Sequence, residues 1–467
     1  MKTPLKASAQ RHALQSALFA AALLAPALAV AAPLQLPPYT RATLKNGLTV
    51  LVMPSRRLPL VEFRLVARAG AASDPAGKEG LASLLSDLLT QGAGARDAQR
   101  IAEDIAFVGG SLRAATSAEQ LVVTCEVLRK DFATGLELFH DVVVTPTFPA
   151  EEFARKQDEA LAGIAASKDD PSSIADNMLL PFLMSENPLG HPVVGYERTV
   201  RALTRDDVSA FHHRFVTPEN AMLAVVGDVD AKATFAALEK AFADWKPGAD
   251  KPAADPPPLS RTGGRRVRIV NKPEVTQTQI RFGGLGVPRN HPDYYPITVA
   301  NTVLGAGFTS RLVNEIRVNQ GLTYSIASRF NMYRNTGTLT VDTFTKNATL
   351  RKTIDETLRV IREFVTGGPT EAELAKAKRY LTGQFPLGLQ APDQLATQLL
   401  SLEFYRLDPK FVETFGERIN AVTMEDARRA AKAYFNPEDF SILVVSNPDS
   451  AKAALAGLGP IEVKEIE

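Results

Sequence analysis

Apolar and polar residues follow two different patterns along this chain. In "TVLVMP" (49–54), "LVEFRLVARAG" (60–70) and "QLVVTCEVL" (120–128), the pattern is that of strands. Segments such as "EEFARKQDEALAGIAAS" (151–167), "YPITVANTVLG" (295–305) and "RKTIDETLRVIREFV" (351–365) have a helical pattern instead. Pairs of strands followed by helices, with polar residues facing outward, predict α+β layers in which helices cover one face of each sheet.

A long segment occurs twice in the sequence. "LTRDDVSAFHHRFVTPENAMLAVVGDVD" begins at Leu203, and "VTMEDARRAAKAYFNPEDFSILVVSNPD" begins at Val422. Thr204 aligns with Thr423, and the offset of 219 residues is constant through both copies. Each copy predicts a helix, a short proline turn and a buried strand. The period is far longer than that of solenoid repeats, so it indicates duplication of a whole domain.

A proline-rich, charged stretch separates the two copies. "WKPGADKPAADPPPLSRTGG" (245–264) has a composition that does not pack and is typical of a linker. The 467 residues are also too many for one ordinary core. We therefore expect homologous domains at 41–245 and 265–458, joined by a linker at 246–264. Each is expected to be a mostly antiparallel sheet covered by helices.

Composition and the N-terminus limit the possible partners and location. The formal net charge is +1, so no nucleic-acid partner is indicated. Residues 1–31 combine a basic start, an apolar run of about a dozen residues and an A-x-A site. They predict a signal peptide cleaved after Ala31 and export to the periplasm without a membrane anchor; the alternative is a buried N-terminal helix. Cys125 is the only cysteine, so no internal disulfide forms, and its strand pattern predicts a core position.

The stretch "EGLASLLSDLLTQG" (79–92) predicts an amphipathic helix over 80–92 that ends at Gly92. Its leucines follow the i, i+3, i+4, i+7, i+8 pattern of a face that packs on a core. The opposite face is polar. The leucines are Leu81, Leu84, Leu85, Leu88 and Leu89, and the polar residues are Ser83, Ser86, Asp87 and Thr90.

The longer segment "AGAASDPAGKEGLASLLSDLLTQG" resembles the part of pitrilysin/insulinase-type zinc peptidases that carries the inverted zinc motif H-x-x-E-H. In that motif two histidines bind zinc, and the glutamate acts as general base. The resemblance places the three motif residues on Ser83, Ser86 and Asp87. It places the third ligand, a glutamate on a later helix, on Gly163. All four positions have changed, so we expect no metal in this chain.

The surroundings of the former motif have changed as well. Glu159 lies one helical turn before Gly163 and is interpreted as a surface or supporting residue. None of the six histidines has ligand spacing on the 80–92 helix, and His212 and His213 are expected on a helix surface. In "GGSLRAATS", Arg113 stands where the family usually has asparagine on an edge strand near the metal.

The second half resembles the family most strongly in "LGAGFTSRLVNEIRVNQGLTYSIASRF" (304–330). The family has an Arg and a Tyr seven residues apart here, and both contact the substrate and transition state. The resemblance assigns these roles to Arg317 and Tyr324; the structural alternative is a helix end and a strand start. The "GAGF" stretch is either a substrate loop or a tight turn before a helix. Its candidate substrate-loop residues are Gly305, Gly307 and Phe308.

The resemblance covers about residues 41–458 and implies half of a clamshell dimer. It leads to the hypothesis of a non-catalytic subunit of an exported heterodimeric zinc metallopeptidase. Arg317 and Tyr324 would serve the active site of a zinc-bearing partner with an intact H-x-x-E-H motif, and the substrate would be an unfolded peptide. The alternative is a peptide-binding or assembly protein without peptidase activity.

Overall fold

The computed structural model describes residues 34–185, 187–248, 255–258 and 264–466. The predicted signal peptide at 1–31 lies outside the described residues. The chain divides into a unit of residues 1–35 and a unit of residues 36–467, and the fold described below is that of the second unit. No helix in the described part of the chain is long and apolar enough to cross a membrane.

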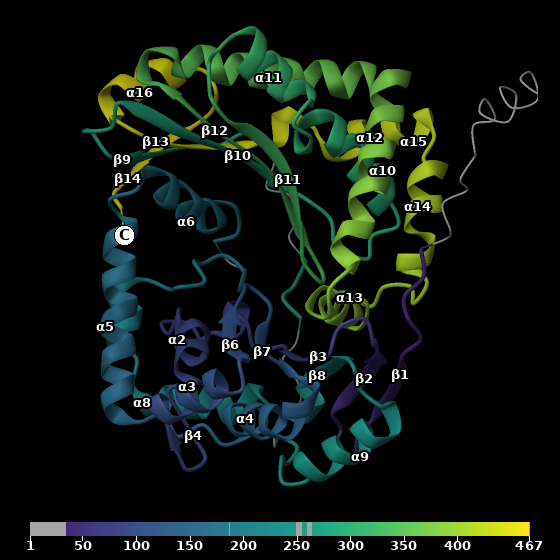
Figure 1. The fold of residues 1–467 in the computed structure, drawn as a ribbon. Helices are drawn as coiled ribbons and strands as arrows, with labels where there is room; N and C mark the ends of the chain where they lie inside the picture. The colour runs from purple at the N-terminus through teal and green to yellow at the C-terminus, as the bar shows by residue number, and fades with distance from the viewer. Residues whose placement is uncertain (1–33, 186, 249–254, 259–263, 467) are drawn as a thin grey trace, which may run out of the picture. The chain divides into compact units, whose positions relative to one another are not determined.

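In the described residues, two six-stranded sheets make up the framework (Figure 1). The strands of one sheet precede the linker in the sequence, and those of the other follow it. The first has the order β1-β2-β8-β3-β7-β6, and the second has the order β14-β9-β13-β10-β12-β11. The first-half strands are β1 (Thr40–Thr43), β2 (Thr49–Pro54), β3 (Leu60–Ala67), β6 (Ser111–Thr116), β7 (Leu121–Leu128) and β8 (Ala221–Gly227). The second-half strands are β9 (Val267–Asn271), β10 (Gln277–Leu285), β11 (Ile326–Met332), β12 (Gly337–Lys346), β13 (Ser441–Ser446) and β14 (Ile461–Lys464). A short ribbon of β4 (Gly92–Ala93) and β5 (Arg96–Asp97) accompanies the first sheet.

The two sheets share one topology except at one edge. Most neighbours are antiparallel, but β2 pairs with β8 and β9 pairs with β13 in parallel. The outer strand of the first sheet, β1, is antiparallel to β2, whereas the outer strand of the second, β14, is parallel to β9. The strands β6 and β11 form the opposite, equivalent edges. The predicted α+β class with two sheet-containing halves is confirmed.

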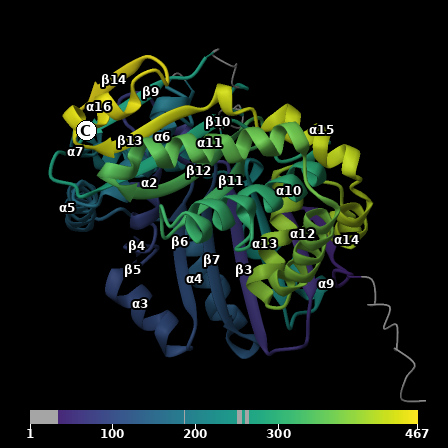
Figure 2. The same cartoon turned by 90° about the horizontal axis from the view of Figure 1, so that it is seen from above.

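Helices surround both sheets. In the first half they are α2 (Leu81–Leu88), α3 (Ala98–Phe107), α4 (Phe132–Val144), α5 (Ala150–Ser167), α6 (Pro171–Leu183), α7 (Glu197–Ala202), α8 (Arg205–Phe215) and α9 (Ala231–Ala241). In the second half they are α10 (Tyr294–Asn301), α11 (Leu350–Gly367), α12 (Glu371–Gln384), α13 (Pro392–Phe404), α14 (Phe411–Ala421), α15 (Met424–Tyr434) and α16 (Pro448–Leu455). Two π-helical segments, Thr302–Ala306 and Val313–Asn319, lie between α10 and β11. The long helix α11 runs across the outer face of the second sheet (Figure 2).

The duplicated segment folds the same way in both halves. Helices α8 and α15 start and end at equivalent positions. Each begins with a capping box, in which Thr204 and Asp207, or Thr423 and Asp426, satisfy each other's backbone N–H groups. A proline turn and a buried strand follow in each copy.

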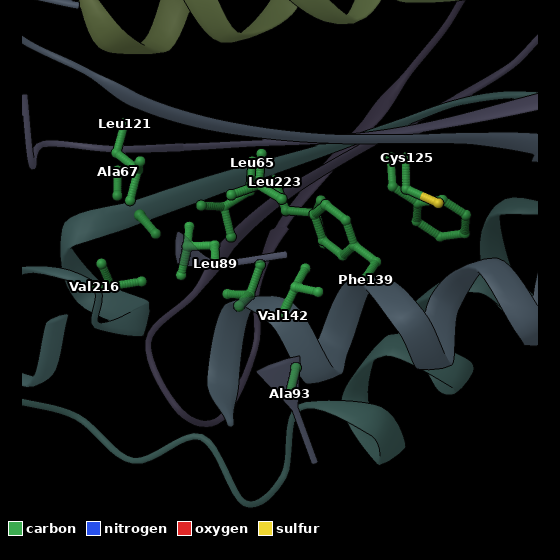
Figure 3. Close-up of a cluster of buried hydrophobic side chains, with 14 of the residues drawn as sticks. Leu65, Ala67, Leu89, Ala93, Leu121, Cys125, Phe139, Val142, Val216 and Leu223 are labelled. Carbon is green, nitrogen blue, oxygen red and sulfur yellow. The ribbon is translucent and has the colours of Figure 1, made fainter. Parts of the chain in front are cut away.

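The core of the first half lies between its sheet and its own helices. Figure 3 shows part of it, where Phe139 and Val142 of α4 lie against the inward side chains of the strands. Cys125 of β7 is fully buried there, and burial raises the pKa of its thiol to about 12. The prediction that Cys125 is a core residue is therefore confirmed.

One helix from each half packs on the sheet of the other half (Figure 1). Helix α13 lies on β3 and β8, where Leu399 and Phe404 contact Val226 and its neighbours. Helix α6 lies on β10 and β13, where Leu179 and Phe182 form a buried cluster with strand residues. The expectation that helices cover only one face of each sheet is thus wrong for the central strands. Because both of their faces are covered, β8 and β13 are buried along nearly their whole length.

A polar cluster also joins the two halves. The backbone N–H of Arg334, in the turn between β11 and β12, donates to the Glu119 carboxylate at 3.0 Å. Asp255, in the described part of the linker, binds the Arg334 guanidinium at 2.8 Å and Arg406 at 3.3 Å. The expectation that the linker does not pack is therefore wrong at Asp255. Glu119 is buried, and desolvation raises its pKa to about 7.

Removing an apolar side chain of α13 tests the importance of its packing on the first sheet. Leu399 is fully buried, so Leu399→Ala should lower the free energy of unfolding by about 2–5 kcal/mol. The measurement is urea-induced unfolding followed by circular dichroism. The control is Leu387→Ala, at a side chain that is 54% exposed, which should change stability by less than about 0.5 kcal/mol. Equal effects of the two substitutions would contradict the assignment.

The raised pKa of Glu119 predicts a pH-dependent stability. Between about pH 4.5 and pH 7, the folded chain keeps a proton on Glu119 that the unfolded chain has lost, so stability falls as the pH rises through this range. The total loss is of the order of 3 kcal/mol. Glu119→Gln should remove this part of the slope, because a neutral amide replaces the carboxyl. Unfolding free energies at pH 5 and pH 8 measure it, with Glu151→Gln at an exposed position as the control.

Candidate functional site

Helix α2, which carries three of the predicted positions, is fixed at its N-terminus by Asp74. The carboxylate of Asp74 accepts from the backbone N–H groups of Gly80 and Ala82, both at 2.8 Å. Gly80 has φ +99°, and a Cβ there would lie 2.7 Å from the carbonyl of Val194, so glycine is required. The five predicted leucines are all buried, as expected. The helix ends at Leu88 rather than at Gly92, which begins the strand β4.

The three motif positions differ in exposure. Ser86 is buried, and its hydroxyl donates to the backbone carbonyl of Ser83 at 2.7 Å, so it does not belong to the solvent-facing side. Asp87 is exposed. Partial desolvation raises the pKa of Asp87, the nearby Lys156 lowers it, and Glu159 raises it. Asp87 is thus the only ionisable group among the former ligand positions.

Helix α5 brings Gly163 to the same place. Gly163 is exposed, and a Cβ built on it would meet nothing within 4 Å. Ser83, Asp87 and Gly163 all line one cavity of about 370 Å³ between α2, α5 and α6. The structure therefore brings together three of the four positions that the resemblance assigned to the zinc site. Glu159 lies on the exposed surface, as expected, and pairs with Lys156 at 2.9 Å.

The side chains at this cavity do not fit a zinc site. A catalytic zinc needs three protein ligands drawn from histidine, cysteine and carboxylates. The former ligand positions hold one carboxylate, one serine and one glycine. Across the described ranges, no group of three or more histidine, cysteine, aspartate or glutamate side chains could hold a metal ion.

One of the two predicted surface histidines is in fact a core residue. His212 is buried, its ring contacts the backbone carbonyl of Val143 at 2.9 Å, and burial lowers its pKa to about 4. The expectation for His212 is wrong, whereas His213 is exposed as expected. The signal was present in the sequence: His212 completes the i, i+3, i+4, i+7 stripe with Val208, Phe211 and Phe215.

The second-half positions lie around the two π-helical segments. Arg317 lies in the segment Val313–Asn319, and its guanidinium stacks on the ring of Phe308 at 5.1 Å. Phe308 is 77% exposed, so its ring meets solvent beside this cation, and Tyr324 is 81% exposed. Single π-helical turns are frequently found at functional sites. None of these residues lines the cavity between α2 and α5.

The two glycines of the "GAGF" stretch differ from Phe308. Gly305 is buried, and a Cβ there would lie 2.4 Å from the hydroxyl of Ser328, so glycine allows close packing on β11. A Cβ built on Gly307 would lie 3.2 Å from the carbonyl oxygen of Thr302. These contacts give both glycines a packing role, whereas the side chain of Phe308 is 77% exposed and can meet a ligand.

Comparison with known proteins agrees with this geometry. The sequence pattern of the insulinase family (peptidase family M16) matches residues 50–197, and that of the peptidase M16 inactive domain matches residues 202–381. A protein named as an uncharacterized zinc protease in Mycobacterium leprae is 30% identical over 403 residues, covering 85% of this chain and 89% of its own length. One of the same description in Bacillus subtilis is 24% identical over 409 residues, covering 87% and 98%.

Solved structures give the same result. The peptidase M16 inactive domain from Pseudomonas fluorescens superposes with a TM-score of 0.80 at 27% identity, covering 87% of this chain and 98% of that one. A protease from Helicobacter pylori has a TM-score of 0.80 at 21% identity, covering 88% and 100%, and supports the fold alone. The chain has two α+β halves, and the two M16 sequence patterns together extend into both of them. These features define a peptidase-type fold. The chain belongs to the M16, or insulinase, family of peptidases.

Restoring the ligands tests whether only side chains separate this cavity from a zinc site. Ser83→His, Asp87→His and Gly163→Glu together should give about one zinc per chain, because the cavity has room at Gly163. The wild-type chain should retain no stoichiometric zinc after dialysis, as measured by elemental analysis. The pair Ser83→His and Asp87→His alone is the control and should bind more weakly. Stoichiometric zinc in the wild-type chain would contradict the assignment.

Proposed function

We propose that this chain is the non-catalytic subunit of an exported, periplasmic heterodimeric zinc metallopeptidase. It supplies Arg317 and Tyr324 to the active site of a partner subunit that carries zinc on an intact H-x-x-E-H motif. The substrate is an unfolded peptide. The zinc belongs to the partner and not to this chain.

The observation that carries the proposal is an asymmetry between the two halves. In the first half, Ser83, Asp87 and Gly163, which the resemblance assigns to the zinc ligands, line one cavity, but no cluster of metal ligands occurs there among the described residues. The second half keeps an arginine and a tyrosine in an exposed aromatic setting. A chain whose only function was its own packing would have no use for a tyrosine that is 81% exposed or for a phenylalanine that is 77% exposed.

The chemistry of the pair suits peptide hydrolysis. Attack on a peptide carbonyl produces an oxyanion, which hydrogen-bond donors aimed at it stabilise. The phenol O–H of Tyr324 is such a donor. The guanidinium of Arg317 offers a planar fork for a carbonyl or carboxylate, and its stacking on Phe308 limits its motion before substrate binds.

The edge of the first sheet offers a place for an extended peptide. Strand β6 is paired on one side only, with β7, among the described residues. It lies beside α2, because the hydroxyl of Thr116 donates to the carbonyl of Ala82 at 2.8 Å. A peptide added to this edge gains backbone hydrogen bonds that do not depend on its sequence. Arg113 is exposed on the same strand.

The same free edge also favours a second function, peptide binding or assembly without a peptidase partner. The genomic neighbourhood discriminates the two. An adjacent gene for an M16 chain with an intact H-x-x-E-H motif favours the subunit, and its absence favours the binding protein.

The role of the pair is tested by the double variant Arg317→Ala and Tyr324→Phe, purified with the zinc-bearing partner. The removal of two groups that stabilise the transition state should lower kcat for hydrolysis of a fluorogenic peptide by at least about 10²-fold. The KM should change less, because these contacts are stronger in the transition state than in the ground state.

The control is Lys376→Ala, at an exposed cation on α12, which should leave kcat unchanged. Analytical ultracentrifugation confirms that each variant still pairs with the partner. Normal turnover by the double variant within an intact complex would rule out the proposed role.

A further inference from the structure

A second cavity lies in the second half, at a place that the proposed function does not use. It measures about 420 Å³ and is enclosed by α10, α12, the edge strand β11 and the residue after α13. This is within the range of sites that bind small ligands. Its walls are mostly aromatic and apolar. They include Tyr294, Phe330, Met332, Tyr380 and Tyr405.

Among the described residues, Arg289 is the only charged side chain that lines this cavity. Its guanidinium contacts two adjacent rings, 4.0 Å from the centroid of Tyr294 and 4.9 Å from that of Phe411. Its Nη1 is buried without a hydrogen-bond partner. Within the described residues, no carboxylate forms an ion pair with it. Arg334, by contrast, is neutralised by Asp255 at 2.8 Å.

An uncompensated guanidinium in an apolar wall selects a particular kind of ligand. Nη1 of Arg289 is buried without a hydrogen-bond partner, so an anion that enters the cavity and accepts from it satisfies that group. A carboxylate matches the guanidinium best, because it accepts two parallel N–H bonds. The hydroxyls of Thr298 and Thr302 already donate to backbone carbonyls at 2.7 and 2.8 Å. The rest of the wall therefore suits an apolar group attached to that carboxylate.

The edge of β11 indicates that the carboxylate belongs to a peptide. In the β11–β12 hairpin, the N–H of Tyr333 donates to the carbonyl of Thr336, so these two residues form a hydrogen-bonded pair. Along antiparallel strands, hydrogen-bonded pairs alternate with non-hydrogen-bonded pairs. Phe330 and Met332 therefore belong to non-hydrogen-bonded pairs, and their N–H and C=O groups point away from β12. Ser328 has the same phase, and Asn301 donates to its carbonyl at 3.2 Å.

The phase of β11 has a direct consequence for the cavity. Phe330 and Met332 line it with their side chains and present their backbone groups on the free edge beside it. An extended chain can hydrogen-bond to such an edge while an adjacent residue enters the cavity. A small carboxylic acid would make no use of this edge.

We propose that this cavity binds the C-terminal residue of an extended peptide with an apolar, preferably aromatic, side chain. The terminal carboxylate pairs with Arg289, the side chain packs against Tyr294, Phe330 and Tyr380, and the preceding backbone follows the edge of β11. The choice of a peptide rests on the proposed function, but binding here needs neither the partner nor zinc.

Isothermal titration calorimetry on the chain alone tests this site. The probe is an N-acetylated tetrapeptide of three alanines and a C-terminal phenylalanine, compared with the same peptide as its C-terminal amide. The free acid should bind with a Kd at least about tenfold lower than that of the amide. Only the acid carries a negative charge that can pair with the Arg289 guanidinium. Equal binding of the two peptides, or no binding of the acid at millimolar concentration, would overturn the proposal.

Variants assign the preference to Arg289. Arg289→Gln should abolish the difference between acid and amide, whereas Arg57→Gln, at an exposed position between β2 and β3, should retain it. Tyr380→Ala leaves the guanidinium stack intact and should weaken the binding of both peptides. Circular dichroism establishes that each variant is folded. A preference for the acid that survives Arg289→Gln would refute the site.

A third ligand, 3-phenylpropionate, distinguishes a site for a peptide C-terminus from a site for a small carboxylic acid. It should bind more weakly than the tetrapeptide acid, because it cannot pair with β11. Tighter binding of 3-phenylpropionate would overturn the peptide assignment. Since all these titrations use the chain alone, they can fail while hydrolysis by the complex succeeds, and the reverse also holds.

Discussion

The reciprocal burial of α6 and α13 is the interaction on which the rest of this structure depends. Each helix covers the second face of the other half's sheet, so β8 and β13 can be apolar on both faces without exposing that surface. The same arrangement positions the first cavity. Helix α6 buries Phe182 against the second sheet, while its Asp176 and Asn177 line the cavity between α2 and α5. Asp176 also binds Arg281 of β10 at 2.6 Å. The cavity that holds the positions assigned to the zinc ligands is thus built on elements anchored in both halves.

Apolar packing and capping hold the helix that carries the positions assigned to the zinc ligands. The leucine face of α2, the Asp74 cap and the close approach at Gly80 would serve an active M16 site equally well. None of them needs a metal ion, because the stability of α2 comes from apolar burial and capping. The M16 fold can therefore form whether or not these positions bind a metal. In the second half, Arg317 stacks on the exposed ring of Phe308.

The sequence predicted those features that depend on local period or on direct repetition. The strands around Cys125, the leucine stripe of α2 and the copies that begin at Thr204 and Thr423 all lie where expected. The sequence did not predict that α6 and α13 each pack on the sheet of the other half, because an amphipathic pattern does not specify which sheet a helix covers. The cavity at Arg289 was missed for a similar reason, since its walls come from segments far apart in the chain. His212 is buried although histidine is polar, because it lies in the apolar stripe of α8, and polarity alone does not predict this.

The central claim is that this chain completes an active site that it cannot form alone. The most direct test is a titration of a fixed amount of the zinc-bearing partner with increasing amounts of this chain, with peptide hydrolysis as the readout. The account predicts no hydrolysis by this chain alone, little by the partner alone, and a rise that reaches its plateau at one chain per partner. Hydrolysis by this chain alone, or a partner whose rate does not change when the chain is added, would contradict it.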